Sequence, residues 1–309
     1  MIKGNYTFPP IQGRDMGRRL PAGWGLVLEG GGTRSFYSAG VFDAFMEGDL
    51  MFPYIAGVSA GAANVISYIS GQLGRTRQVV AHYVGDKRYV SKRNLLKLGT
   101  LFGNDFIFHT IPQRHVAMDW AVFHRQKLHF YTGAFDCIAG VTRWFGKEHV
   151  DPELRATIAS CALPLVSPIA VYQGMQLLDG GLADPIPIEK SLSDGNRFHV
   201  VVLTRNRGYR KAPFAPLFLA KGRYRAYPRL VETLRLRHEI YHRQLAICEQ
   251  LERAGKAILI RPRETLRVHR TGSDVPKLLQ LYDEGVAEGR EALPQILSKA
   301  GISPEVKSR

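Results

Sequence analysis

A serine between two glycines is the first residue of the chain with the context for covalent chemistry. Ser59 stands in the segment Gly57-Val58-Ser59-Ala60-Gly61, after the apolar run 54–58 and before a stretch with helical character. G-x-S-x-G at a strand-to-helix junction is typical of a nucleophile elbow, a sharp turn that exposes the serine hydroxyl. The pattern predicts that Ser59 is a nucleophile and that Gly57 and Gly61 relieve crowding in the turn.

Two further glycine-containing segments supply what a serine nucleophile requires. Gly30-Gly31-Gly32-Thr33-Arg34 follows the apolar run 26–28, so backbone amides without side chains stand at the end of a strand, where they can bind an anion. Asp179-Gly180-Gly181 offers a carboxylate on a turn after the run 176–178. A serine attack needs a base for its proton and donors for the oxyanion. The three segments together predict acyl-transfer chemistry.

These motifs, in this order, resemble the patatin-like phospholipases, which have a glycine-rich oxyanion loop with an arginine, a G-x-S-x-G serine and a D-G-G/A aspartate. The similarity runs from Trp24 to Thr204 and includes Ala159-Ser160-Cys161-Ala162-Leu163-Pro164 and Ser167-Pro168. The chain is most similar to the bacterial branch with a basic helical C-terminal extension. It departs from many members at Ser35, where they have glycine.

The resemblance implies a function and a set of site residues. Ser59 is expected to be the nucleophile and Asp179 its base, with an oxyanion loop of Gly30, Gly31, Gly32 and Arg34. The expected activity is hydrolysis of acyl esters of lipids, of the phospholipase or lysophospholipase type. No metal or organic cofactor is implied. A salt bridge at the strand end is the alternative interpretation of Arg34.

Other functions remain open at this stage. An ordinary α/β-hydrolase would need a late histidine for a Ser-Asp-His triad, and the candidates are His199, His238, His242 and His269. The segment His238-Glu239-Ile240-Tyr241-His242 also matches the H-E-x-x-H pattern of zinc proteases, although nearby arginines disfavour a dication. A non-catalytic lipid-binding or scaffold protein with the same fold is the alternative from another functional class.

Composition narrows the class of protein. The chain of 309 residues has 45% hydrophobic residues, enough for a buried core. Its three cysteines, Cys137, Cys161 and Cys248, are widely spaced, which favours a reducing compartment. The first 22 residues lack the apolar core of a signal peptide, and no run of 18 apolar residues occurs. We therefore expect a cytoplasmic protein, or one peripheral at the inner membrane surface.

Positive charge is concentrated late in the chain. Of the formal net charge of +15, most lies after residue 204, and Arg205 to Arg237 contains ten basic residues and one acidic residue, Glu232. Aromatic and apolar residues interleave them, as in segments that bind anionic bilayer surfaces. The stretch predicts an anionic membrane surface as a partner, with a basic linker as the alternative. No motif for binding nucleic acid or a nucleotide phosphate accompanies the charge.

The pattern of elements predicts an α/β fold. Strand-like runs at 25–29, 54–58, 127–135, 138–145, 168–172, 175–178 and 198–204 alternate with helical stretches at 35–48, 60–72 and 75–84. A further helix is expected to begin at Pro152 with Asp151 as its N-cap. The alternation predicts a central, mainly parallel sheet in a three-layer α/β/α arrangement, which the resemblance makes patatin-like.

The expected organisation has three parts. Residues 1–23 form a polar N-terminal arm, residues 24–207 the catalytic domain, and residues 208–309 a smaller, basic, mostly helical region with helices near 228–253 and 276–298. The segment 89–123 is rich in aromatic residues without a clear period. Five of these are candidates for an acyl-chain pocket, with core packing as the alternative for each: Phe102, Phe106, Phe108, Trp120 and Phe123.

Overall fold

A central sheet of mostly parallel strands organises the chain, and the structure, a computed structural model, describes residues 9–264 and 268–303. The sheet order is β10-β9-β2-β4-β5-β8-β7, and β6 pairs with β5. The pairs from β10 to β5 are parallel, whereas β6, β8 and β7 join in antiparallel pairs. In chain order the strands of this sheet are β2 (Trp24–Leu28), β4 (Tyr54–Val58), β5 (His129–Asp136), β6 (Val141–Gly146), β7 (Ala170–Tyr172), β8 (Met175–Asp179), β9 (Phe198–Val202) and β10 (Ala257–Ile260).

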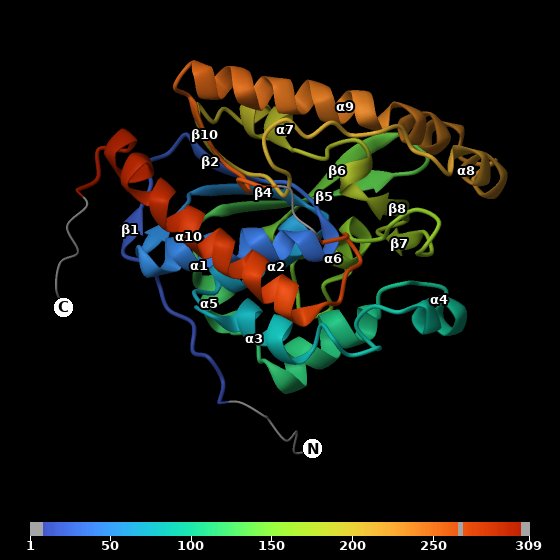
Figure 1. Ribbon diagram of the computed structural model, residues 1–309, viewed down its shortest axis with the longest axis horizontal. Coiled ribbons are helices and arrows are strands. Elements are labelled where there is room, and N and C mark those ends of the chain that lie inside the picture. The colour runs from blue at the N-terminus through green and yellow to red at the C-terminus, as the bar shows by residue number, and fades with distance from the viewer. Residues whose placement is uncertain (1–8, 265–267, 304–309) are drawn as a thin grey trace.

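Helices cover both faces of the sheet, as Figure 1 shows. One face carries α9 (Pro228–Arg253) and α7 (Ile188–Ser193), and the other carries α1 (Phe36–Glu47), α2 (Ser59–Ile69) and α10 (Val275–Lys299). The central strands are buried on both faces, as expected when helices lie above and below a parallel sheet. The predicted three-layer α/β fold is therefore confirmed.

The remaining elements extend this framework. The short strands β1 (Arg18–Arg19) and β3 (Leu50–Met51) form a separate parallel pair. The other helices are α3 (Arg75–His82), α4 (Lys92–Leu98), α5 (Trp120–Arg125), α6 (Arg155–Ser160) and α8 (Leu217–Arg223), with shorter or irregular turns η1 (Gly32–Ser35), η2 (Phe106–His115), η3 (Lys147–His149) and η4 (Gly180–Leu182). Residues 1–8 of the expected N-terminal arm lie outside the described residues.

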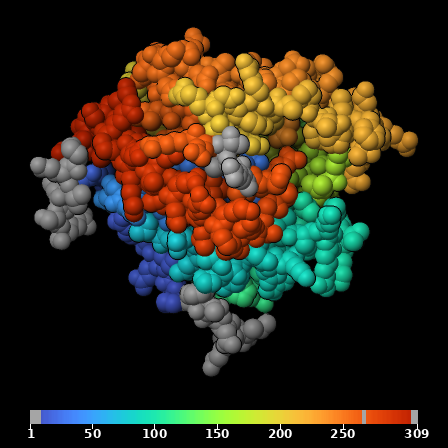
Figure 2. Space-filling view, in the orientation of Figure 1, coloured from blue at the N-terminus to red at the C-terminus, as the bar shows by residue number. Residues whose placement is uncertain are grey.

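The C-terminal region is built into the same body. Its strand β10 pairs with β9, and its helix α10 lies against α1. The two helices approach closely at glycines. A Cβ added at Gly40 would lie 2.0 Å from the backbone carbonyl oxygen of Tyr282, and one at Gly285 would lie 2.0 Å from that of Tyr37. Figure 2 shows α10, in orange and red, covering the blue N-terminal elements on this face.

The expected start of one helix was wrong. The helix expected from Pro152 begins only at Arg155, because the Asp151 carboxylate accepts from the amides of Glu153 and Leu154 in a turn and Leu154 has a φ of +52°. Asp184 does not cap the following helix, which begins at Ile188 without a side-chain cap. Its carboxylate instead accepts a hydrogen bond from Gln244 Nε2 of α9 at 2.9 Å.

Candidate active site

Ser59 lies on a strained turn at the end of β4. Its φ is +54°, in the left-handed region that residues with a side chain seldom adopt. Its backbone N–H donates to Ser160 Oγ at 2.7 Å, and Ser160 Oγ donates to the Gly133 oxygen at 2.5 Å. Gly61 is required by close packing, since a Cβ there would lie 2.6 Å from the Glu29 oxygen. The turn points the hydroxyl away from the strand, as in a nucleophile elbow.

The structure brings Ser59 and Asp179 into direct contact. Ser59 Oγ donates to Asp179 Oδ2 at 2.6 Å, and both residues are buried. Strand register explains the contact: Val58 pairs with Gly133 in β5, and the next residue, Ala134, pairs with Asp179 at the end of β8. The carboxylate therefore occupies the place next to the hydroxyl that the imidazole would take in a triad.

The surroundings of Asp179 favour a proton acceptor. Burial raises the pKa of its carboxyl above the ordinary value, and the hydrogen bond from Ser59 and the positive charge of Arg237 oppose that shift. The second carboxylate oxygen, Oδ1, accepts from the Gly181 amide at 2.8 Å, which fixes the orientation of the group. A buried carboxylate with a raised pKa is a stronger base than an exposed one.

The glycine-rich loop lies directly beside the serine. A Cβ at Gly30 would lie 2.8 Å from Ser59 Cβ, so only glycine allows this approach. Gly32 has a φ of +57° and packs against the Arg270 oxygen, which accepts a hydrogen bond from Thr33 N at 3.0 Å. Within the described part of the chain, the amides of Gly31 and Gly32 donate to no protein acceptor. They lie beside the N-terminus of α2, where negative charge is favoured.

Arg34 is buried and forms no ion pair with a carboxylate among the described residues, although the nearby charge of Glu29 favours its charged form. Its side chain is 8% exposed, and its Nε has no hydrogen-bond partner among the described residues. Burial and the neighbouring Arg205 lower its pKa to about 10. The structure thus places Arg34 in a cavity beside the serine, rather than in a salt bridge at the strand end.

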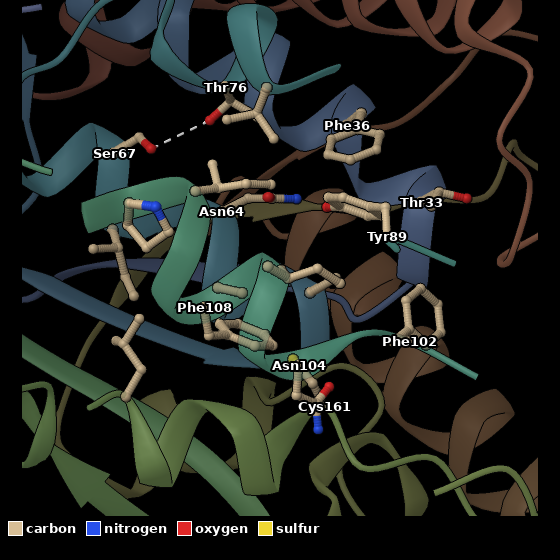
Figure 3. Close-up of a pocket in the computed structure, with 18 of the residues that line it drawn as sticks. Thr33, Phe36, Asn64, Ser67, Thr76, Tyr89, Phe102, Asn104, Phe108 and Cys161 are labelled. Atoms are coloured by element: carbon tan, nitrogen blue, oxygen red, sulfur yellow. Dashed lines mark hydrogen bonds between the residues drawn. The ribbon is translucent and has the colours of Figure 1, made fainter. Parts of the chain in front are cut away.

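An apolar cavity of about 130 Å³ opens on one side of Ser59. Figure 3 shows the rings of Phe36, Tyr89, Phe102 and Phe108 around this space. Of the five aromatic residues proposed from the sequence, Phe102, Phe108 and Trp120 line the cavity, whereas Phe106 and Phe123 are buried in the core. The segment 89–123 folds into α4, η2 and α5 to form this wall, and such a cavity fits a hydrocarbon chain.

A second cavity, of about 500 Å³, opens on the other side of Ser59 and is strongly basic. It is lined by five cationic side chains, Arg34, Arg205, Lys211, Arg237 and Arg270, and by the carboxylates of Glu29 and Asp179. Ser59, Gly32 and Leu163 line both cavities. An ester carbonyl at Ser59 would thus have apolar space on one side and cationic space on the other.

The sequence did not identify several residues of this site. Ser160 lies in a motif that assigns it no role, and Lys211 and Arg237 belong to the basic stretch that the sequence predicts to bind a membrane. The structure divides that stretch: Arg205, Lys211 and Arg237 face the second cavity, while Arg229 and Arg235 bind Ala139 O and Glu232. No local signal singled out Arg270, because its place beside the serine arises only when the loop before α10 returns to η1.

The late histidines have other contacts. His199 lies in β9 with its Nδ1 3.2 Å from Ser191 Oγ, and His242 Nε2 accepts from the Lys211 amide at 2.9 Å. His269 borders the second cavity, but the Ser59 hydroxyl bonds to Asp179 and not to an imidazole. In the described residues, His238, Glu239 and His242 belong to no group placed to hold a metal ion.

Comparison with known proteins adds to the geometry. Residues 26–191 match the family described as Patatin-like phospholipase, and residues 227–299 match the Domain of unknown function (DUF6363). The uncharacterized protein YjjU of Escherichia coli (strain K12) is 32% identical over 186 residues, which are 58% of this chain and 51% of YjjU. The chain therefore spans about half the length of that curated relative.

One solved structure is similar at the level of overall shape. VipD from Legionella pneumophila superimposes with a TM-score of 0.43 and 13% sequence identity, over 91% of this chain and 67% of VipD. A superposition this loose supports no inference about this site. Every helix within the described ranges is too short or too polar to cross a lipid bilayer.

Proposed function

Since this chain belongs to the patatin-like phospholipase family, we propose that it is a serine hydrolase that cleaves acyl esters of lipids through Ser59 and Asp179. The observation that supports this most directly is the 2.6 Å hydrogen bond from Ser59 Oγ to Asp179 Oδ2 on a strained turn between the two cavities. The contact joins the nucleophile and the base that the sequence motifs suggested.

The proposed reaction has two halves. In the first, Ser59 Oγ attacks the ester carbonyl while its proton passes to Asp179 Oδ2, and the tetrahedral intermediate then collapses, so that the carbonyl re-forms as the C–O bond to the alcohol breaks and the alcohol leaves with that proton. In the second, water attacks the acyl-serine, Asp179 accepts its proton, and the proton returns to Ser59 as the fatty acid leaves. The amides of Gly31 and Gly32 and the N-terminus of α2 stabilise the oxyanion in both halves.

The apolar cavity supports a fatty acyl group as the part transferred. Its walls come from α2, η2 and the Tyr89–Phe102 region, and it begins at the serine. Burying a hydrocarbon chain is favourable by roughly 0.8 kcal/mol per methylene, so the cavity would select acyl groups over acetate. Phospholipid, lysophospholipid and simpler acyl esters all satisfy this requirement.

We also propose that the protein works at an anionic membrane surface. Apolar side chains are exposed on three elements: Leu96 and Leu98 on α4, Val171 on β7, and Phe218 and Leu219 on α8. Basic residues flank them, Lys92, Arg93 and Lys97 on α4 and Lys221, Arg223 and Arg225 on or beside α8. Figure 1 shows α4, β7 and α8 at the same end of the long axis, and we call this end the basic tip. Exposed apolar groups framed by cations suit a headgroup interface.

Loss of the nucleophile tests the enzymatic proposal. We expect Ser59→Ala to lower ester hydrolysis by several orders of magnitude, roughly ten-thousand-fold or more, and to abolish labelling by a fluorophosphonate probe. Ser193→Ala, at an exposed serine of α7, is the matched control and should behave like the parent protein. If the parent protein neither reacts with the probe nor hydrolyses any acyl ester, the non-catalytic lipid-binding alternative is correct.

A further inference from the structure

The basic cavity beside Ser59 contains more positive charge than the fold neutralises. Among the described residues, none of its five cationic side chains forms an ion pair with a carboxylate. The two acidic groups of the wall offset part of this charge, since Glu29 attracts Arg34, Lys211 and Arg237 and Asp179 attracts Arg237. Two carboxylates face five cations, and gathered cations with too few counter-charges are costly unless an anion enters among them.

The five cations reach the cavity from separate parts of the chain. Arg34 comes from η1, Arg205 follows β9, Lys211 precedes α8, Arg237 projects from α9, and Arg270 lies before α10. They are close enough to affect one another: burial and then Arg237 lower the pKa of Lys211 to about 7, with smaller contributions from Arg34 and Arg270. Arg34, more than nine-tenths buried and with its Nε unpartnered, lines the same space.

We propose that this cavity binds the phosphate of the substrate's alcohol group, and that the substrate is an anionic glycerophospholipid or lysophospholipid. The inference rests on the proposed function. In such a lipid the phosphate lies on the same glycerol unit as the ester, so an ester at Ser59 can place its acyl chain in the apolar cavity and its phosphate in the basic cavity. Arginine and lysine are the side chains that bind phosphate oxygens most strongly.

The wall also disfavours a choline headgroup. Quaternary ammonium groups bind in cages of open aromatic faces, and the rings that line this cavity are those of Tyr209 and Phe214. Arg205 already lies over the Tyr209 ring at 4.2 Å, and Lys211 lies over the ring of the neighbouring, buried Tyr241 at 4.6 Å. A second cation there would be repelled, so the geometry selects a net negative headgroup over a zwitterionic one.

Kinetics with short-chain substrates test the inference away from any membrane. We would compare dihexanoyl phosphatidylglycerol, dihexanoyl phosphatidylcholine and dihexanoylglycerol as monomers, with enzyme concentration set by fluorophosphonate titration. We expect kcat/KM for the phosphatidylglycerol to exceed that for either of the others by roughly tenfold or more, the value of one or two charge-assisted hydrogen bonds. Equal values for the three substrates, or a preference for phosphatidylcholine, would overturn the proposal.

Variants assign the effect to the cavity. Lys211→Met and Arg270→Gln should each lower the ratio of kcat/KM for phosphatidylglycerol to that for dihexanoylglycerol by about tenfold, and Lys211→Arg should retain it. A general loss of packing would lower the kcat/KM values of both substrates and leave their ratio unchanged. Arg210→Gln, at the exposed residue before Lys211, is the matched control and should not change the ratio. An unchanged ratio in Lys211→Met and Arg270→Gln contradicts the proposal.

Binding and added phosphate separate the remaining outcomes. Calorimetry with Ser59→Ala should show dihexanoyl phosphatidylglycerol bound more tightly than phosphatidylcholine, and Lys211→Met in that background should remove the difference. This readout tests the cavity even if the protein is not an enzyme. If instead inorganic phosphate alters hydrolysis of dihexanoylglycerol while the three esters are cleaved equally, the cavity serves free phosphate and not a headgroup. Active protein with no headgroup preference in either assay refutes this inference alone.

Discussion

Asp179 combines burial with direct contact to the nucleophile, so its protonation is expected to control turnover. Asp179→Asn should reduce hydrolysis by orders of magnitude, because an amide cannot accept the Ser59 proton. Asp184→Asn is the matched control: that residue binds Gln244 of α9, and the variant should keep substantial activity at some cost in stability. Both are measured as kcat/KM on a soluble ester. Full activity in Asp179→Asn would exclude the proposed base.

The pH dependence of hydrolysis follows from the same group. Asp179 must be ionised to accept a proton, and burial raises its pKa above the ordinary value. Activity should therefore fall as the pH is lowered through that raised pKa, at a higher pH than for an exposed aspartate. The measurement is log kcat/KM against pH for a neutral ester. An activity that stays constant down to the ordinary aspartate range would contradict a buried base.

Lys211 makes a second, separable pH prediction. Its pKa is lowered to about 7, so its ammonium is present below that pH and is lost above it. The preference for phosphatidylglycerol over dihexanoylglycerol should therefore decrease by roughly fivefold between pH 6 and pH 8, since a charged donor is lost. A phosphodiester does not titrate in this range, and the ratio cancels effects on the dyad.

The neighbours of Lys211 determine the controls for this titration. The charged and titratable groups that face it are Arg237, Tyr241 and His242 on α9, Arg34 in η1, Glu29 after β2 and Arg270 before α10. His242 is the alternative titrating group beside Lys211, because histidine ordinarily titrates closest to neutral pH, and its burial and then Arg210 lower the pKa of this imidazole. Lys211→Met should make the ratio independent of pH, whereas His242→Gln should preserve the dependence. The opposite pattern would assign the effect to His242.

At the scale of elements, the packing of α10 on α1 holds the C-terminal region against the catalytic core. Gly285→Ala should destabilise the protein by about 2 kcal/mol or more, because the new methyl group would lie 2.0 Å from the Tyr37 oxygen and the helices must separate. Gly222→Ala in α8, where a Cβ meets nothing within 4 Å, should instead be neutral or stabilising by about 0.5–1 kcal/mol. Denaturant unfolding measures both, and equal effects would disprove the close approach.

At the scale of the whole molecule, the basic tip should direct the protein to anionic bilayers. Neutralising Lys221, Arg223 and Arg225 together should weaken sedimentation with anionic vesicles by roughly tenfold to a hundredfold, at about 1 kcal/mol for each charge. Phe218→Ser with Leu219→Ser should also weaken it. The matched control neutralises Arg253, Lys256 and Lys299. These exposed residues lie where α9 and α10 end, at the left of Figure 1 and opposite the basic tip.

Salt and lipid composition complete this test. Binding through the basic tip should fall steeply as salt rises, because the Debye length is about 8 Å at physiological ionic strength. Hydrolysis of a small soluble ester should remain in the Lys221, Arg223 and Arg225 variant, since these residues lie outside both cavities. Equal binding to neutral and anionic vesicles, or equal loss in the control variant, would remove the basic tip from the proposal.

The sequence by itself determined the α/β class and the positions of the motifs that meet in the structure. Buried parallel strands appear as short apolar runs, and glycines with positive φ or close contacts mark the turns after β2 and β4, so these signals are local. The expected helix start at Pro152 was wrong because the Asp151 carboxylate stabilises a turn before the helix. The sequence leaves open this choice between two local hydrogen-bond patterns.

Only the tertiary structure decided what surrounds the serine. Strand register sets Asp179 against Ser59, and the return of α9 and the loop before α10 brings Arg237 and Arg270 to the same cavity. In the sequence these arginines look like any basic residues on a helix or loop. Their role depends on which neutral or acidic groups lie opposite them, and such contacts between distant segments form only when the sheet and its two helical layers assemble.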